Sequence, residues 1–162
     1  MRTRIGAVAA LTFLSICMVL VVWWIARPGP ETISGPWVLD TTARIAKGVV
    51  RVSGSTSLPE GALLHVYAWH DAIENAAAPS PFDWESTVAV KDERFIAEFA
   101  PIGWPRGRVN IVVSFSVDGD AIQPSQVVAA VGAGGISLTG PAVTVGEDGA
   151  RFLSASTSID LR

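Results

Sequence analysis

An uncharged apolar run near the N-terminus constrains this chain more than any other feature. The run Ile5–Ala26 holds 22 residues without a charged side chain, with Arg2 and Arg4 before it and Arg27 after it. A helix of that length rises about 33 Å, which is enough to cross the hydrocarbon core of a bilayer. We therefore expect residues 1–27 to form a transmembrane signal anchor, followed by a separate water-soluble domain.

Two other interpretations of this run remain open. A cleaved signal peptide has a shorter apolar segment and small residues before the cut, whereas cleavage after Ala26 would place bulky Trp24 at the −3 position. A lipoprotein signal would end at Cys17, but Ile16 stands where a small residue is expected and the chain stays apolar beyond the cysteine. Both patterns fit less well than an uncleaved anchor.

The flanking charges predict the orientation of the anchor. Arg2, Arg4 and the amino terminus outweigh Arg27, so the N-terminus should remain in the cytoplasm. The domain after the anchor would then lie on the other side of the membrane, in a periplasm or an equivalent space. Localisation in the cytoplasmic membrane, with a single pass, follows from the same pattern.

The anchor also carries candidate contact residues. Gly6, Ala9 and Ala10 form a small-residue face that would allow another helix to approach closely, although small residues that simply face lipid explain the pattern equally well. Trp23 and Trp24 lie at the outer end, where indole rings favour the membrane interface. The run contains no histidine or charged side chain, so we expect no bound cofactor and no proton relay in it.

Charge and cysteine content exclude several function classes for the rest of the chain. Of the 12 basic residues in the 162-residue chain, three flank the apolar run, so the exported part has nine basic residues against 15 acidic ones, a net charge of −6. Nucleic-acid binding, which needs clustered Lys and Arg, is not expected. The single cysteine, Cys17, lies in the anchor, so no intrachain disulfide can form.

Alternating apolar residues predict a mainly β domain behind a Pro/Gly linker at residues 28–36. Several segments alternate with period two and are separated by turn signals, as in an immunoglobulin- or fibronectin-like antiparallel β-sandwich over residues 37–162. A small barrel is the alternative. The expected strands are Gly48–Ser53, Ala62–His70, Glu85–Lys91, Arg94–Ala100, Arg108–Val117, Ala142–Val145 and Arg151–Leu161.

Other segments are less regular. Trp37–Leu39 either begins the first strand or packs near the membrane surface, and Pro124–Val131 matches a short helix that ends at Gly132. The strand Ala62–His70 has bulky residues on both faces and is expected at the centre of a sheet. The segment Asp71–Asp83 is a long excursion with two prolines, which is typical of a functional loop.

Parts of the sequence resemble a group of uncharacterised bacterial exported domains. The similarity covers roughly residues 49–141, through GSTSLPEGALLHV, RFIAEF, GWPRGRVNIVVSF and QPSQVVAAVGAGGISLTGP, where an S-L-P-x-G turn opens the sandwich. The motifs are structural turns. The resemblance therefore implies a β-sandwich and an export route in a bacterium, hence the inner membrane and the periplasm, but no activity and no site residues.

No motif predicts an enzyme. The two histidines, His65 and His70, lie five positions apart and point to opposite faces of a strand, so they cannot chelate one metal ion. No serine occupies a G-x-S-x-G nucleophile turn. Asp118–Asp120 is more typical of a hairpin turn than of a weak calcium site. Gly132–Gly135 is glycine-rich but lacks the preceding strand, the glycine spacing and the following helix of a dinucleotide-binding loop. We expect no catalytic, metal-binding or cofactor-binding residues.

The aromatic residues of the domain are the remaining candidates. Trp69 is expected in the core, whereas Phe82, Trp84 and Trp104 lie at or beside loops, where an exposed interface is as consistent with the sequence as burial. Together with Gly6, Ala9, Ala10, Trp23 and Trp24, these three loop residues are the candidate partner interface.

The anchor and the absence of an active-site motif favour a non-catalytic, single-pass accessory or scaffold subunit. The helix would pack against integral membrane protein subunits in the lipid bilayer, and the sandwich would dock on the periplasmic face of the complex. Photosynthetic and respiratory assemblies are one class of complex in which such small subunits are often seen. No small-molecule substrate is predicted. The alternative is a free-standing anchored module for carbohydrate, peptide or envelope components, with Trp84 and Trp104 on one exposed platform.

Overall fold

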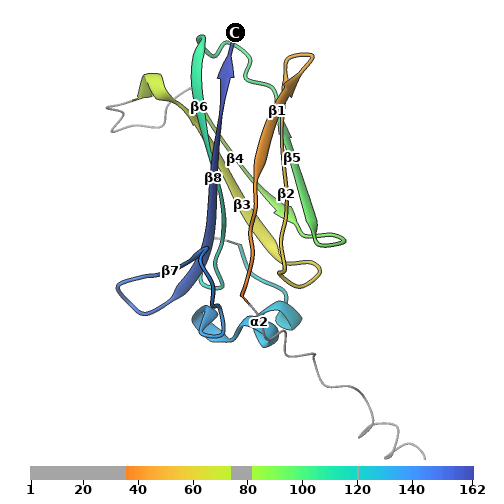
Figure 1. The fold of residues 1–162 in the computed structure, drawn as a ribbon, viewed down its shortest axis with the longest axis vertical. Coiled ribbons are helices and arrows are strands. Elements are labelled where there is room, and N and C mark those ends of the chain that lie inside the picture. The colour runs from red at the N-terminus through yellow and green to blue at the C-terminus, as the bar shows by residue number, and fades with distance from the viewer. Residues whose placement is uncertain (1–35, 74–81, 120) are drawn as a thin grey trace, which may run out of the picture. The chain divides into compact units, whose positions relative to one another are not determined.

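The computed structural model describes residues 36–73, 82–119 and 121–162, which form two antiparallel sheets (Figure 1). The smaller sheet has the strand order β1 (Thr42–Ala46), β2 (Val49–Ser55), β5 (Arg94–Phe99). The larger sheet has the order β4 (Asp83–Ala89), β3 (Leu63–His70), β6 (Gly107–Phe115), β8 (Arg151–Leu161), β7 (Val143–Val145). This arrangement confirms a mainly β domain with two sheets.

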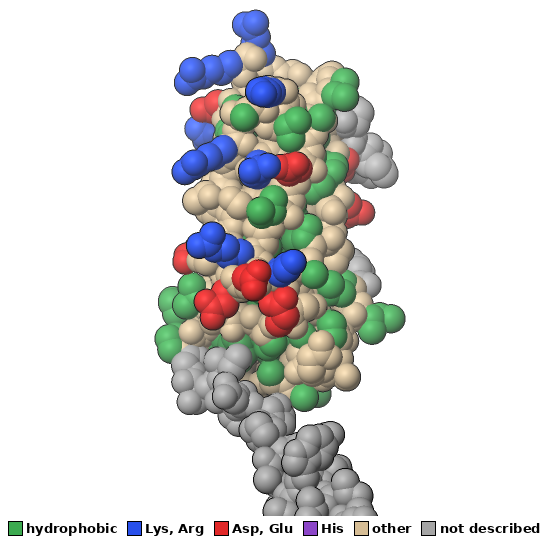
Figure 2. Space-filling view, turned by 90° about the vertical axis from the view of Figure 1, so that its right-hand side faces the viewer, with side chains coloured by type: hydrophobic (Ala, Val, Ile, Leu, Met, Phe, Trp, Pro, Cys, Tyr) green, Lys and Arg blue, Asp and Glu red, His purple; other side chains and the backbone are tan. Residues whose placement is uncertain are grey.

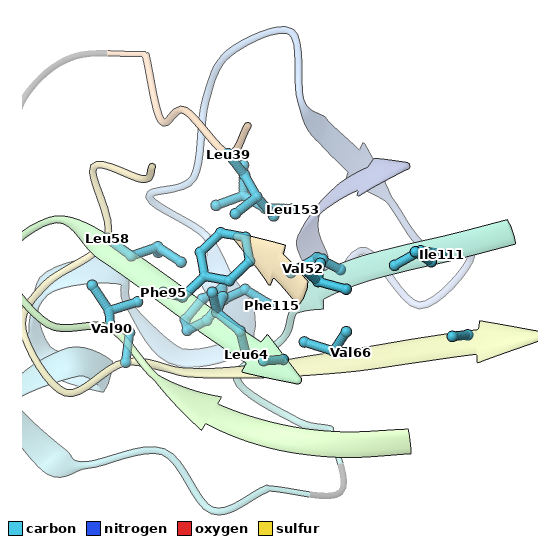
Figure 3. Packing of buried hydrophobic residues seen from close by; sticks show 14 of the residues in the cluster. Leu39, Val52, Leu58, Leu64, Val66, Val90, Phe95, Ile111, Phe115 and Leu153 are labelled. Atoms are coloured by element: carbon cyan, nitrogen blue, oxygen red, sulfur yellow. The ribbon is translucent and has the colours of Figure 1, made fainter. Parts of the chain in front are cut away.

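The predicted alternation decides which side chains enter the space between the sheets. On β6, every second residue from Val109 to Phe115 is fully buried, as the sequence predicts. The facing residues of β2, β3 and β5 alternate in the same way, and their side chains meet between the sheets (Figure 3). The shared core includes Val50, Val52, Leu64, Val66, Ala68, Phe95, Ala97, Phe99, Leu153 and Leu161.

The chain passes repeatedly between the two sheets. After the β1–β2 hairpin it crosses to β3 and β4, returns to β5, and crosses again to β6. β3 lies between β4 and β6, which confirms the predicted central strand. Between β6 and β7, the chain forms α2 (Ser125–Val131) and the short 3-10 turn η2 (Ala133–Gly135), and a second 3-10 turn, η1 (Asp71–Ile73), follows β3.

A tight two-residue turn between Lys91 and Arg94 joins β4 to β5. Asp92 and Glu93 both have positive φ, 51° and 58°, as a type I′ turn requires. Lys91 and Arg94 exchange two backbone hydrogen bonds of 2.8 and 2.9 Å across it. This turn fixes the start of β5 and so the register of its buried phenylalanines.

The first residues of the domain differ from the prediction. Trp37 is 1% exposed, so it belongs to the core and does not face a membrane surface. Its backbone N–H donates to Thr139 O at 2.7 Å and its indole Nε1 donates to Ser137 O at 3.0 Å. Trp37 thereby ties the start of the described chain to the segment after α2. Leu39 makes only an isolated bridge with Thr56, and the first full strand is β1.

Three other segments are placed differently or lie beyond the described part. β4 covers Asp83–Ala89, two residues earlier than predicted at each end. Asp118 and Gly119 lie in the connection from β6 to α2, so they do not form a hairpin turn. The predicted anchor, its linker up to residue 35 and most of the loop after η1 lie outside the described residues. Among the described helices, none is long and apolar enough to span a bilayer.

The outer face of the smaller sheet is mixed in character. Figure 2 looks at the side where β1, β2 and β5 lie, and basic and acidic side chains alternate there with scattered hydrophobic ones. Arg51 of β2 pairs with Glu98 of β5 at 2.5 Å, both partners being well exposed. A surface with both signs of charge does not favour a ligand of one charge. The outer face of the larger sheet differs in this respect.

Candidate functional site

The outer face of the larger sheet gathers aromatic and acidic side chains on β3 and β4. His65, Tyr67 and Trp69 alternate with the buried residues of β3 and therefore point away from the core. In the β3–β4 register, Tyr67 lies opposite Glu85 and Trp69 opposite Asp83, and directly paired residues project from the same face. These five residues form what we call the aromatic face.

The two large aromatic rings of this face are in contact. The Tyr67 and Trp69 ring centroids are 5.4 Å apart, and the ring planes are inclined by 23°. Such an offset-stacked pair restricts both side chains without burying them in the core. Because both residues belong to one central strand, their spacing is set by the backbone of β3 rather than by a loop.

Two carboxylates give the aromatic face a negative field. The pKa of Tyr67 is raised first by partial burial, then by the nearby Asp83 carboxylate and then by Glu85. His65 Nε2 lies 3.4 Å from Glu85 Oε2, and the Glu85 side chain is 73% exposed. In the part of the chain that the structure describes, neither acid pairs with a lysine or an arginine.

A small cavity of mixed polar and apolar lining adjoins the aromatic face at the start of β3. Its volume is about 150 Å³, which suits a few water molecules or one small polar group better than a cofactor. Its lining residues come from β3, β4, β6 and the β6–α2 connection: Leu63, His65, Thr87, Ser114, Ser116, Gly119, Ala121 and Gln123.

This cavity lacks the contacts of a nucleophilic site. Ser114 of β6 lies directly opposite His65 in the sheet, and His65 in turn approaches Glu85. A serine nucleophile needs a hydrogen bond to its base, and none joins Ser114 to His65 among the described residues. The described residues also contain no group of three or more His, Cys, Asp or Glu side chains placed to hold a metal ion.

His70 lies on the opposite face from His65, as the alternation predicts. It is 4% exposed, and its Nδ1 accepts the Ala72 backbone N–H at 3.0 Å. Its Nε2 is buried without a hydrogen-bond partner among the described residues, against the backbone of Gly107. Asn110 donates a hydrogen bond to Asp71, the first residue of η1. His70 therefore holds the start of the β3–β4 loop.

The predicted interface residues of the domain are half-buried rather than freely exposed. Trp84 of β4 stacks on Phe99 of β5, with ring centroids 4.7 Å apart and planes inclined by 17°. The Trp104 ring also lies against Phe99, with centroids 5.6 Å apart and planes inclined by 43°, and both tryptophans contact the core. These rings join β4 to β5 and close the gap between the sheets. Phe82 is half-buried with its ring edge toward His70, at 6.4 Å.

The sequence interpretation of Trp69 is wrong. Trp69 was expected in the core, whereas the structure places it on the outer face beside Tyr67, because the buried side of β3 is occupied by Leu64, Val66 and Ala68. The alternation in this strand contains the signal that could have identified the aromatic face. The remaining candidates, Gly6, Ala9, Ala10, Trp23 and Trp24, lie outside the described residues.

No protein-family model matches this chain, and no curated protein sequence matches it significantly. The functional interpretation therefore depends on the residues of the chain and on their geometry.

Proposed function

We propose that this chain is a non-catalytic accessory subunit, held in the bacterial inner membrane by residues 1–27, whose periplasmic β-sandwich docks onto a partner protein through the aromatic face. The observation that carries this proposal is the Tyr67–Trp69 pair, which stands outside the core on a rigid central strand. Tyrosine and tryptophan are the residues most enriched where protein interfaces gain their binding energy.

The strand order supports a scaffold of the immunoglobulin type. With β1, β2 and β5 taken as strands A, B and E, the larger sheet becomes C′ (β4), C (β3), F (β6) and G (β8). Sandwiches of this type serve as frames for recognition surfaces more often than for catalysis. The aromatic face would then lie on the sheet that contains strands C and F.

The anchor supports the accessory role through the linker that follows it. Only residues 28–36 separate the predicted anchor from the buried Trp37, and five of these nine residues are Pro or Gly, at positions 28, 29, 30, 35 and 36. A short linker rich in proline keeps a domain close to the membrane. The sandwich would therefore reach mainly partners that are themselves membrane proteins, including subunits of photosynthetic or respiratory complexes.

A second candidate is a free-standing anchored module that binds carbohydrate. It is favoured by the position of the small cavity, because His65 lies on the same strand as the aromatic pair and hydroxyl groups of the neighbouring β4 and β6, on Thr87 and Ser114, line the cavity beside it. A sugar ring has an apolar face that can stack on an aromatic ring and hydroxyls that need hydrogen-bond partners. The platform for such a ligand would be Tyr67 and Trp69, since Trp84 and Trp104 pack against the core.

Purification of the tagged native chain in a mild detergent tests the accessory role. We expect the chain to elute in a complex well above its own mass of 17.0 kDa, together with defined integral membrane proteins. Trp69→Ala, which removes an outer-face ring, should release the partner, whereas Ile96→Ala on the outer face of the smaller sheet should not. Recovery of the wild-type chain only as a monomer would contradict the accessory role.

A further inference from the structure

The chemistry of the aromatic face identifies what the partner must supply. Its two stacked rings present electron-rich π-systems, and Asp83 and Glu85 flank them on the neighbouring strand. We infer that the aromatic face binds a cationic side chain, an arginine or lysine of the partner protein, over the Tyr67–Trp69 pair and between the two carboxylates. This inference rests on the proposed docking role and specifies its chemistry.

The ring geometry suits a cation. Ammonium and guanidinium groups are attracted to the face of tryptophan or tyrosine within about 6 Å of the ring centroid, and guanidinium also stacks in parallel on such rings. In an offset pair the rings cover one another only in part, and the outward-pointing parts of both remain accessible; Tyr67 and Trp69 are each only half-buried. A planar guanidinium would extend the stack.

The carboxylates add direction and charge. Asp83 and Glu85 lie opposite Trp69 and Tyr67 in the register, so both acids stand beside the rings rather than at a distance. On the outer face of β6, Arg108 Nε lies 3.9 Å from Oδ1 of Asp160 on β8, so Arg108 pairs with that acid. His65 is the other group near Glu85, at 3.4 Å. Within the described residues, the negative charge at the rings is therefore left for a cation from outside.

A neutral ligand would use these groups differently. A sugar needs hydrogen-bond acceptors and donors but gains nothing from net charge, whereas a bound cation loses affinity when the acids become amides and when salt rises. The same substitutions therefore distinguish a basic protein segment from a glycan. The acid-to-amide changes keep the shape and most of the hydrogen bonds of the aromatic face.

The test is a binding titration of the full chain in nanodiscs with an acetylated, amidated hexa-arginine peptide, by calorimetry at low and moderate salt. We expect saturable binding that weakens with salt. The double variant Asp83→Asn/Glu85→Gln and the single variant Trp69→Ala should each weaken binding by about tenfold, which corresponds to about 1.4 kcal/mol.

The matched control removes the same charge elsewhere. Asp92→Asn/Glu93→Gln, at the exposed β4–β5 turn, should leave the affinity within about twofold of the wild type. An equal loss in this control would reduce the binding to a general effect of net charge and overturn the inference. No binding of the peptide would also overturn it, and so would tight binding of a neutral oligosaccharide such as chitohexaose that the Asp83/Glu85 change leaves intact.

Failure of this titration leaves the docking role itself standing. A wild-type chain that purifies with membrane partners but does not bind the peptide would show a docking surface of another chemistry. A chain that binds the peptide at the aromatic face yet purifies alone would show a cation site without the accessory role.

Discussion

The His70 imidazole packs closely against Gly107 at the point where β3 ends and β6 begins. Gly107 has φ of 142°, and a Cβ added there would lie 2.9 Å from both Cε1 and Nε2 of His70. The imidazole is buried and fixed by its bond from Ala72, so it cannot swing away cheaply. A glycine at this position is a requirement of packing as well as of backbone conformation.

We predict that Gly107→Ala lowers the free energy of unfolding by about 2–4 kcal/mol, the sum of strain at a positive φ and overpacking against the imidazole. Gly103→Ala is the matched control in the same β5–β6 connection, because its φ is 78° and nothing lies within 4 Å of an added Cβ. This control should lose only about 1 kcal/mol. Urea unfolding measures both, and equal losses would contradict the His70 contact.

Tyr67 provides a spectroscopic test of the negative field at the aromatic face. It is the only tyrosine in the chain, so the phenolate absorbance reports this residue alone. We expect its midpoint above the ordinary pKa of about 10, because partial burial, Asp83 and Glu85 all oppose the phenolate. Asp83→Asn should lower that pKa while burial keeps it above the ordinary value.

The raised pKa of Tyr67 makes the stability of the folded domain depend on pH in the alkaline range. Because the folded-state pKa of Tyr67 is raised, its contribution to stability is complete below pH 10 and is lost as the pH rises from there through the folded-state pKa. Asp83→Asn should therefore flatten the fall in stability in this alkaline range. An unchanged Tyr67 midpoint in this variant would contradict the effect of the Asp83 carboxylate on Tyr67.

Among the elements, β3 depends on a side chain that takes the place of a neighbouring strand. The Gln123 amide accepts the Leu63 backbone N–H at 2.9 Å and donates to the carbonyls of Leu63 and Ser116 at 2.8 and 3.0 Å. Gln123 is buried, and it precedes Pro124 at the start of α2. It therefore connects the start of β3, the end of β6 and the helix.

We predict that Gln123→Ala costs about 2–4 kcal/mol of unfolding free energy, because it leaves the partly buried backbone groups of Leu63 and Ser116 without their partner. Gln126→Ala, on the exposed side of α2, changes the same residue type and should cost less than about 0.5 kcal/mol. Thermal unfolding compares the two. A Gln123→Ala variant as stable as Gln126→Ala would show that Gln123 does not support β3.

The elements with regular alternation were predictable from the sequence. β3, β5 and β6 each place apolar residues at every second position, and these residues form the buried side of each strand. β1 was missed because its five residues include Arg44, and four of the five are exposed. Its position depends on pairing with β2, which is a long-range contact that no local pattern contains.

The aromatic face shows the same limit at the site. The alternation of β3 assigns Tyr67 and Trp69 to one side, but only the β3–β4 register brings Asp83 and Glu85 beside them. For Trp84 and Trp104 the sequence left exposure and burial equally open, and it is the stacking on Phe99 that draws them toward the core. Sequence alone cannot specify which distant ring an edge tryptophan will meet.

For the whole molecule, two surfaces of the sandwich differ in kind. The outer face of the smaller sheet mixes both signs of charge, with Arg51 and Glu98 paired. The larger sheet carries the aromatic face, whose two acids pair with no lysine or arginine among the described residues. A docking role requires the partner to meet the second surface and not the first. The membrane anchor, if retained as proposed, would restrict that partner to the periplasmic side of the inner membrane.

Photo-crosslinking in native membranes tests this requirement most directly. A photoreactive amino acid replaces either Thr87, which lies opposite His65 beside the aromatic face, or Ile96, which is 57% exposed on the outer face of the smaller sheet. We predict a discrete adduct with a membrane protein from position 87 and none from position 96, and the position-87 adduct should disappear in the Trp69→Ala background. Adducts of equal yield from both positions, or none from position 87, would contradict docking through the aromatic face.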